Sequence, residues 1–168
     1  TSTVWSLIVS PSFLFLLIAF AIGTLVVTGL VQWLPSFFVR RFDISTAQVG
    51  LYYGLAFGGG SIVGMIGGAK FANRMIARDM RWSMWLACIS YALVFPMYLA
   101  VLWLPYFTGA IVMVTLASLV AGVAYGPVWA AIQNFTPPQM RATATAIALL
   151  AGNLLGGGLG PLVVGLVS

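Results

Sequence analysis

The chain has 168 residues, of which 62% are hydrophobic and only 5% charged, whereas soluble domains average about a quarter charged residues. It contains no His and no Glu, and its only acids are Asp43 and Asp79, so we expect neither an enzyme nor a metal or cofactor site, because acid–base catalysis and metal ligation need such groups. The net charge of +5 comes from basic residues between apolar runs, a pattern typical of membrane topology and not of nucleic-acid binding.

The first predicted element is a membrane span over residues 12–39. A helix needs about 20 mainly apolar residues to cross the hydrocarbon core, and residues 1–39 carry no charge. Ser10 and Pro11 are typical of a helix start, with an N-cap followed by proline at the first helical position. Pro35 predicts a kink near the far end.

Two further spans are predicted on either side of a basic connector. Ser45 and Gln48 have the spacing of a capping box, which predicts a helix start and a span over residues 46–69. The basic connector, KFANRMIARDMR, covers residues 70–81. The third span then covers residues 82–102.

The remaining apolar sequence predicts two more spans. Residues 82–140 contain no charge and are too many for one helix. The sequence WLPY at 103–106 favours a break at a membrane interface, where aromatic residues and proline are common. The fourth span therefore covers residues 106–132, and the turn QNFTPPQMR leads into a fifth span over 141–167.

The distribution of basic residues predicts the orientation. Five basic residues are expected on the side of the connector: Lys70, Arg74, Arg78, Arg81 and Arg141. The other side has only Arg40 and Arg41, close to Asp43. The positive-inside rule therefore places the N-terminus of this chain and the connector in the cytoplasm. The fifth span would end outside, so we expect at least one returning helix beyond this chain.

Two stretches repeat the same glycine spacing 98 residues apart: GLAFGGGSIVGMIG from Gly54 and GNLLGGGLGPLVVG from Gly152. Helices in lipid gain no hydrophobic energy by associating, so small residues that let backbones approach closely favour their packing. The pair Gly60 and Gly64 extends the first motif. The predicted packing positions are Gly54, Gly58, Gly152, Gly156 and Gly160.

The constant offset also predicts an internal repeat. The spans at 46–69 and 141–167 would be equivalent helices in two three-helix units, the first over residues 12–102 and the second, incomplete, over 106–168. Internal repeats of this kind are typical of secondary transporters, in which one bundle rocks against another. This is the first pattern in the sequence that indicates a function.

The chain resembles the C-terminal six-helix half of a major facilitator superfamily transporter, from its seventh to its eleventh helix. VQWLPSFFVRRFDIS at 31–45 looks like the end of the seventh helix, and GPVWAAIQNFTPPQMRATATAIALLAGNLLGGGLGPLVVG at 126–165 looks most like the Spinster-like branch. The resemblance implies an all-α membrane protein with five spans, set in a bacterial inner membrane. It also implies a transporter of lysophospholipids or sphingoid lipids, coupled to protons, whose N-terminal half lies outside this chain.

The basic connector resembles a loop motif of that superfamily, with two departures. Asn73 stands where the motif usually has Asp, and Ala69 stands where it prefers Gly, while Arg74 and Arg78 match. The candidate gating residues are Asn73, Arg74, Arg78 and Arg141. The basic residues could equally serve only as a topology signal. In a helical loop, Arg74, Arg78 and Arg81 would share a face and could contact anionic lipid head groups.

Candidate substrate contacts are polar and aromatic, because no acid or base lies deep in a span. They are Gln32, Thr28, Tyr53, Tyr125, Trp129 and Asn153. Gln32 and Asn153 are the side chains least favourable to leave unpaired in lipid, although each could instead join two helices. At most one of Tyr52 and Tyr53 can line a cavity well.

Three readings of function remain open from the sequence. The first is a transporter of an amphiphilic lipid, with membrane lipids around it and the N-terminal half of the same protein as its partner. The second is an organic-anion symporter, whose basic cavity residues would have to lie outside this chain. The third is a structural membrane subunit in which the glycines serve only packing.

Overall fold

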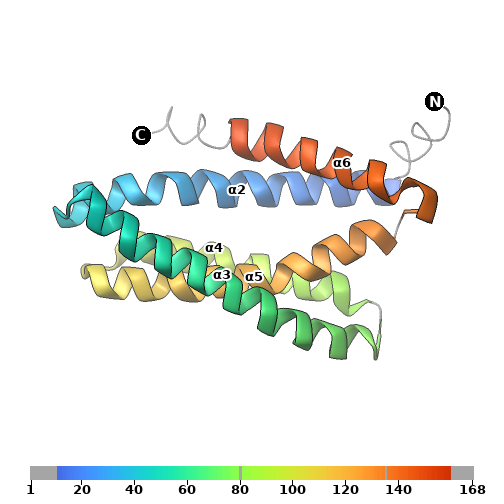
Figure 1. Ribbon diagram of the computed structural model, residues 1–168, viewed down its shortest axis with the longest axis horizontal. Coiled ribbons are helices and arrows are strands. Elements are labelled where there is room, and N and C mark those ends of the chain that lie inside the picture. Colours follow the sequence, from blue (N-terminus) through green and yellow to red (C-terminus); the bar gives the residue numbers. More distant parts are fainter. Residues whose placement is uncertain (1–10, 80, 135, 160–168) are drawn as a thin grey trace. The chain divides into compact units, whose positions relative to one another are not determined.

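The computed structural model describes residues 11–79, 81–134 and 136–159, and these residues form helices joined by short turns, with no strand among them (Figure 1). The helices are α2 (Pro11–Phe42), α3 (Thr46–Ile76), α4 (Trp82–Trp103), α5 (Phe107–Asn134) and α6 (Arg141–Ala151), with a 3₁₀ turn η1 (Pro138–Met140) and a π-helix η2 (Gly152–Leu159). The predicted all-α membrane fold is confirmed, and each predicted span overlaps one of the long helices or, for the fifth, α6 with η2.

Helix α2 contains the first predicted span and ends at a left-handed residue. Asp43 has a φ of 51°, a conformation that terminates many helices and that Asp tolerates better than most residues. Arg40 and Arg41 lie in the last turn, where positive side chains interact favourably with the negative end of the helix dipole. Ser10, the predicted N-cap, lies outside the described residues.

Helix α3 begins as predicted but ends later. Ser45 is its N-cap, and the Ser45 hydroxyl accepts a hydrogen bond from the Gln48 backbone N–H at 3.3 Å, which is one of the two bonds of a capping box. The Gln48 Oε1 accepts from the same hydroxyl at 3.1 Å. The helix continues past the predicted span to Ile76, and the Ala77 N–H still bonds to the Asn73 carbonyl at 3.0 Å. Lysine and arginine are unfavourable inside the lipid but are good helix formers. Lys70 and Arg74 can therefore lie beyond the membrane-crossing part of α3 and still be helical.

Helices α4 and α5 are separated by the predicted break. The backbone turns extended at Leu104, with a ψ of 128°, and α5 starts at Phe107. Three helical segments in the described part of the chain are long and apolar enough to cross a membrane: Thr46–Ile76, Trp85–Trp103 and Phe107–Asn134. Pro96 and Pro127 lie inside α4 and α5 without interrupting the helical assignment.

The fifth predicted span changes its helix type part of the way along. An α-helix covers Arg141–Ala151, and a π-helix follows over Gly152–Leu159. The π form pairs each N–H with the carbonyl five residues back; it is rare and is frequently found at functional sites. Gly160 and the rest of this predicted span lie outside the described residues.

The chain divides into two compact units. One is Leu34–Val128, and the other combines Thr1–Trp33 with Trp129–Ser168. Helices α2 and α5 each pass from one unit into the other, beside Pro35 and Pro127 respectively. The internal repeat of residues 12–102 and 106–168 stays a prediction.

Within the Leu34–Val128 unit, α3 lies against α5 through a row of small residues (Figure 1). The row consists of Ala56, Gly60, Gly64, Gly68 and Ala72, four residues apart and all buried. A Cβ atom added at Gly64 would overlap the carbonyl oxygen of Leu119, and one added at Gly68 would lie 2.5 Å from the Cα of Val123. The two backbones are therefore close enough that only glycine fits at these positions.

The predicted packing positions Gly54 and Gly58 do not belong to this row. A Cβ atom added at either would meet no other atom of the described residues within 4 Å. Gly58 and Gly60 are two residues apart, which places them on nearly opposite sides of a helix with 3.6 residues per turn. Among the described residues, the contact with α5 therefore uses the extension of the motif, Gly60 and Gly64, together with Gly68.

Candidate substrate site and basic connector

In the unit formed by Thr1–Trp33 and Trp129–Ser168, Phe20 connects three helices. Its ring meets the Trp129 ring of α5 edge-on, with centroids 5.5 Å apart. A Cβ atom added at the buried Gly152 would lie 2.8 Å from Cε1 of Phe20. The glycine therefore allows the first turn of η2 to lie directly on the Phe20 ring, and α2, α5 and η2 meet there.

Polar side chains continue along α2 from Phe20 at intervals of four residues. The Thr24 hydroxyl donates to the Phe20 carbonyl at 2.8 Å, and the Thr28 hydroxyl donates to the Thr24 carbonyl at 2.7 Å. Gln32 follows one turn later and is exposed on the surface of this chain. The two threonines thus direct their donors to their own helix, and Gln32 has the most accessible polar side chain of the row.

Asn153 lies at the start of η2, immediately after Gly152. Its side-chain Nδ2 donates to the Leu149 carbonyl four residues earlier, at 2.8 Å, and the side chain is exposed. A π-helix shifts the backbone N–H groups to carbonyls five residues back, so a side-chain donor can serve the carbonyl four residues back. This hydrogen bond therefore links the start of η2 to the last turns of α6.

The predicted tyrosine contacts lie in the other compact unit, Leu34–Val128. Tyr53 is 8% exposed; its ring stacks on Phe57 at 5.9 Å and meets Phe38 edge-on at 6.1 Å. Tyr52, its neighbour, is 48% exposed and meets Phe107 edge-on at 5.8 Å. Tyr53 is thus part of the aromatic core, and of the two residues it is Tyr52 that faces outward.

The six predicted substrate contacts are therefore divided between the units. Thr28, Gln32, Trp129 and Asn153 belong to the first, and Tyr53 and the 53% exposed Tyr125 belong to the second. Phe20 was missed by sequence reasoning. The available signal was its position one helical turn before Thr24, which places Phe20 on the same side of α2 as the predicted contact Thr28. The amino-acid sequence from Gly152 to Leu159 fits an α-helix as well as the observed π-helix, so the π-helix could not be predicted.

The first residues of the basic connector, 70–76, belong to α3, and the residues after Ile76 form a tight turn that leads to α4. The Met75 carbonyl accepts hydrogen bonds from the N–H groups of Arg78 and Asp79, at 3.0 and 3.1 Å. Arg74 is on α3, whereas Arg78 lies in the turn and Arg81 immediately before α4. The helical face that would bring Arg74, Arg78 and Arg81 together does not form, because α3 ends at Ile76.

The remaining predicted gating residues are accessible. Asn73 is exposed on α3, and Arg141 is exposed at the first residue of α6, in the other compact unit. The gating role of Asn73, Arg74, Arg78 and Arg141 stays a prediction.

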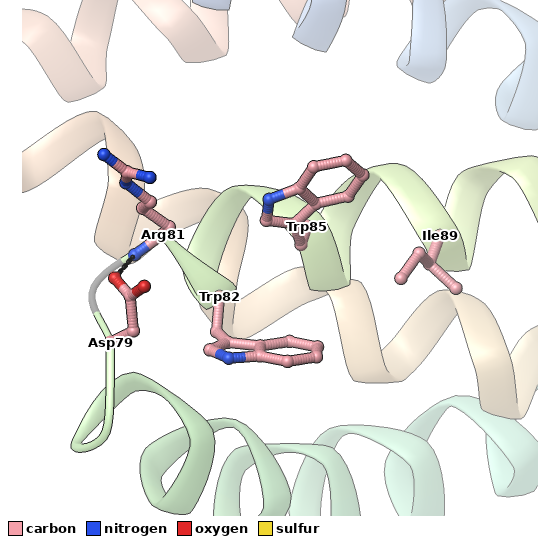
Figure 2. A pocket seen from close by; sticks show the side chains of 5 residues that line it. All are labelled: Asp79, Arg81, Trp82, Trp85 and Ile89. Atoms are coloured by element: carbon pink, nitrogen blue, oxygen red, sulfur yellow. Dashed lines mark hydrogen bonds between the residues drawn. The ribbon is translucent and has the colours of Figure 1, made fainter.

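The end of the connector also lines an open pocket of about 300 Å³ (Figure 2). Its lining residues are Asp79, Arg81, Trp82, Trp85 and Ile89. Oδ1 of Asp79 accepts a hydrogen bond from the backbone N–H of Arg81 at 2.9 Å, which fixes the turn before α4.

Long apolar helices, close glycine packing and charges confined to connectors and the end regions of helices define this chain as part of an integral membrane helical bundle. The chain belongs to the major facilitator superfamily, whose family model matches residues 1–161.

Two relatives extend this result. The chain is 30% identical over 164 residues to an MFS-type efflux pump of Mycolicibacterium smegmatis (strain ATCC 700084 / mc(2)155), covering 98% of this chain and 38% of that protein. It is also similar to the crystal structure of a bacterial homologue of the human lysosomal transporter Spinster, in an inward-facing and occupied conformation. That likeness has a TM-score of 0.80 and 25% sequence identity, over 91% of this chain and 33% of the solved chain. The chain thus spans about a third of the length of these relatives.

Proposed function

We propose that the intact protein carrying this chain is a secondary transporter that works by alternating access. Its cargo would be a lysophospholipid or sphingoid-type amphiphile, and its transport would be coupled to protons. The observation that most supports this proposal is the similarity of nearly the whole chain to the Spinster homologue. The motifs at residues 126–165 point to the same branch and do not depend on that structural comparison.

The contact between α3 and α5 is suited to movement. Gly60, Gly64 and Gly68 leave no side chains to interlock with α5, and helices in lipid lack a hydrophobic force holding them in one register. A small shift of one helix along the other would then break few side-chain contacts. Alternating access requires such shifts between or within bundles.

The charges of this chain suggest where the coupling residues would lie. Every acid and base is between the predicted spans or at the first residue of one. Embedded ionisable residues are the usual carriers of protons in transporters. In this proposal, therefore, the proton is carried by residues of the intact protein outside this chain.

The residues available for an amphiphile combine amides with aromatic rings. Gln32 and Asn153 offer exposed amide groups, and Trp129 offers an aromatic surface near Phe20. Ligand sites are typically apolar with a few polar groups that fix orientation. The amides would bind the polar head of the cargo, and the rings would contact its chain.

The proposal is tested by substituting the two amides in the intact protein. Gln32→Ala and Asn153→Ala should each reduce uptake of a radiolabelled lysophospholipid into proteoliposomes at least about fivefold, because each removes a polar contact worth about 1 kcal/mol. Matched controls are Gln133→Ala and Asn134→Ala, which remove the same side chains from the exposed end of α5. Protein amounts in the vesicles are measured for every variant.

Unchanged uptake in both test variants would remove Gln32 and Asn153 from the site. Failure of the intact wild-type protein to bind or move lysophospholipid would contradict the cargo itself and favour the structural-subunit alternative. Uptake of an organic anion in its place would favour the symporter alternative.

A second candidate is export of a hydrophobic small molecule, favoured by the relative described as an efflux pump. Export differs from the first candidate in direction and cargo. Active accumulation of an amphiphilic dye in inside-out vesicles, driven by a proton gradient and unaffected by lysophospholipid, would favour it.

A further inference from the structure

The pocket at the end of the basic connector lies where α4 enters the apolar layer. Trp82 is the first residue of α4, and the segment apolar and long enough to cross a membrane begins at Trp85. Tryptophan is enriched at the level of lipid head groups because its ring is apolar and its N–H is polar. These positions favour a place for the pocket near lipid head groups.

The cationic group of the pocket is directed away from its acid. The Asp79 carboxylate binds the backbone N–H of Arg81 at 2.9 Å, and Figure 2 shows the guanidinium extending away from that carboxylate. Arginine binds phosphate oxygens through two parallel hydrogen bonds when its fork is accessible. The connector adds Lys70, Arg74 and Arg78, all exposed, so four basic residues stand against one acid.

An apolar row leads from the pocket along α4. Trp85, Ile89 and Leu93 are 61%, 46% and 50% exposed, and their spacing of four residues places them on one side of the helix. The adjacent Leu86 and Ser90 are buried. The row is thus an outward-facing apolar surface that continues directly from Arg81.

We propose that this pocket binds an anionic phospholipid of the surrounding bilayer. The lipid phosphate would lie on the Arg81 guanidinium, and one acyl chain would lie along Trp85, Ile89 and Leu93. The site is separate from the residues proposed to contact cargo and does not depend on the identity of that cargo.

The arrangement favours a lipid over a soluble anion. A soluble phosphate would use only Arg81, and would leave the exposed Trp85 and Ile89 without a role. A zwitterionic lipid offers the same acyl chain, but its positive group would be repelled by the basic connector. Basic residues near a membrane surface contribute about 1 kcal/mol each toward anionic lipids, so a negative head group should be selected.

Native mass spectrometry of the intact protein in detergent tests the site. Phosphatidylglycerol should be retained in preference to phosphatidylcholine at equal concentration, and Arg81→Gln should weaken retention of the first phosphatidylglycerol about fivefold. The charge-matched control is Arg41→Gln, which removes an exposed arginine at the end of α2. Its effect should be less than about twofold.

A second pair of variants tests the acyl-chain contact. Trp85→Ala should weaken phosphatidylglycerol retention, while Trp103→Ala should not, although Trp103 is 85% exposed at the other end of the same helix. Size-exclusion profiles establish that each variant is folded. The proposal is overturned if Arg81→Gln and Arg41→Gln have equal effects, if Trp85→Ala changes nothing, or if glycerol 3-phosphate displaces the bound lipid at the same concentration as phosphatidylglycerol.

Discussion

Helix α3 is packed in two different ways along its length. Near its start, Tyr53 joins an aromatic cluster with Phe38 and Phe107, in which Phe38 meets Tyr53 at 6.1 Å and Phe107 at 5.9 Å. Further along, Gly60, Gly64 and Gly68 bring the backbone against α5. Side chains set the helix separation in the first region, and the backbones themselves set it in the second.

The two regions should therefore respond in opposite ways when a side chain is made smaller or larger. In the aromatic cluster, removing atoms leaves a cavity whose lining loses its contacts. In the glycine row, adding a single carbon forces the helices apart. Substitutions in each direction therefore separate the two kinds of packing.

The largest effect is expected from Phe38→Ala. Phe38 is fully buried and meets Phe37, Phe42, Tyr53 and Phe107. Its truncation should lower the free energy of unfolding by about 3–5 kcal/mol, measured as a lower thermal midpoint of the purified intact protein in detergent.

The control for this truncation is Phe95→Ala. Phe95 is 52% exposed on α4, so the same loss of atoms should have an effect of less than about 1 kcal/mol. Equal effects of the two substitutions would show that the aromatic cluster does not hold α2, α3 and α5 together.

The second effect is expected from Gly64→Ala. The new methyl group would overlap the Leu119 carbonyl oxygen, which belongs to the α5 backbone and cannot move aside alone. We expect a loss of about 1–3 kcal/mol in stability, measured in the same thermal assay.

Gly58→Ala is the matched control on the same helix. Its methyl group would meet no described atom within 4 Å, and alanine is favoured over glycine in a helix interior by about 0.5–1 kcal/mol. Gly58→Ala should therefore leave stability unchanged or raise it. A destabilising Gly58→Ala together with a neutral Gly64→Ala would reverse the assignment of the packing face.

The sequence predicted the helices well because hydropathy and capping are local signals. The charge-free stretches and the capping-box pattern at Ser45 and Gln48 predicted where the helices start to within about a residue or two. Helix α3 continues beyond the predicted span because Lys70 and Arg74 end the apolar stretch without ending the helix. Membrane-crossing length and helix length are different quantities.

The candidate site could be predicted only in part. Glycine spacing indicated close packing, but Gly54 and Gly60 fit the pattern equally well. Only the neighbouring helix decides which side of α3 is in contact. Tyr53 was predicted to line a cavity; within the described residues it is 8% exposed and its ring meets Phe38 of α2, a contact between two helices for which the sequence has no signal.

The smallest effect is expected from Ser118→Ala on α5, opposite the row of small residues on α3. The Ser118 hydroxyl lies 3.2 Å from the Ala56 carbonyl of α3 and 2.9 Å from the Thr115 carbonyl of its own helix. One hydroxyl proton serves one of them at a time, so its loss should lower stability by about 0.6 kcal/mol, as is usual for interhelical hydrogen bonds in membranes.

A double-mutant cycle with Gly60→Ala sharpens this last prediction. A methyl group at Gly60 would overlap the Ser118 hydroxyl and also lie 2.6 Å from the Thr115 carbonyl oxygen. Ser118→Ala removes the first obstacle but not the second, so the double variant should be more stable than the sum of the single losses predicts, yet less stable than Ser118→Ala alone. Strict additivity would mean that the hydroxyl moves aside freely, and that the α5 backbone alone limits how closely α3 can approach.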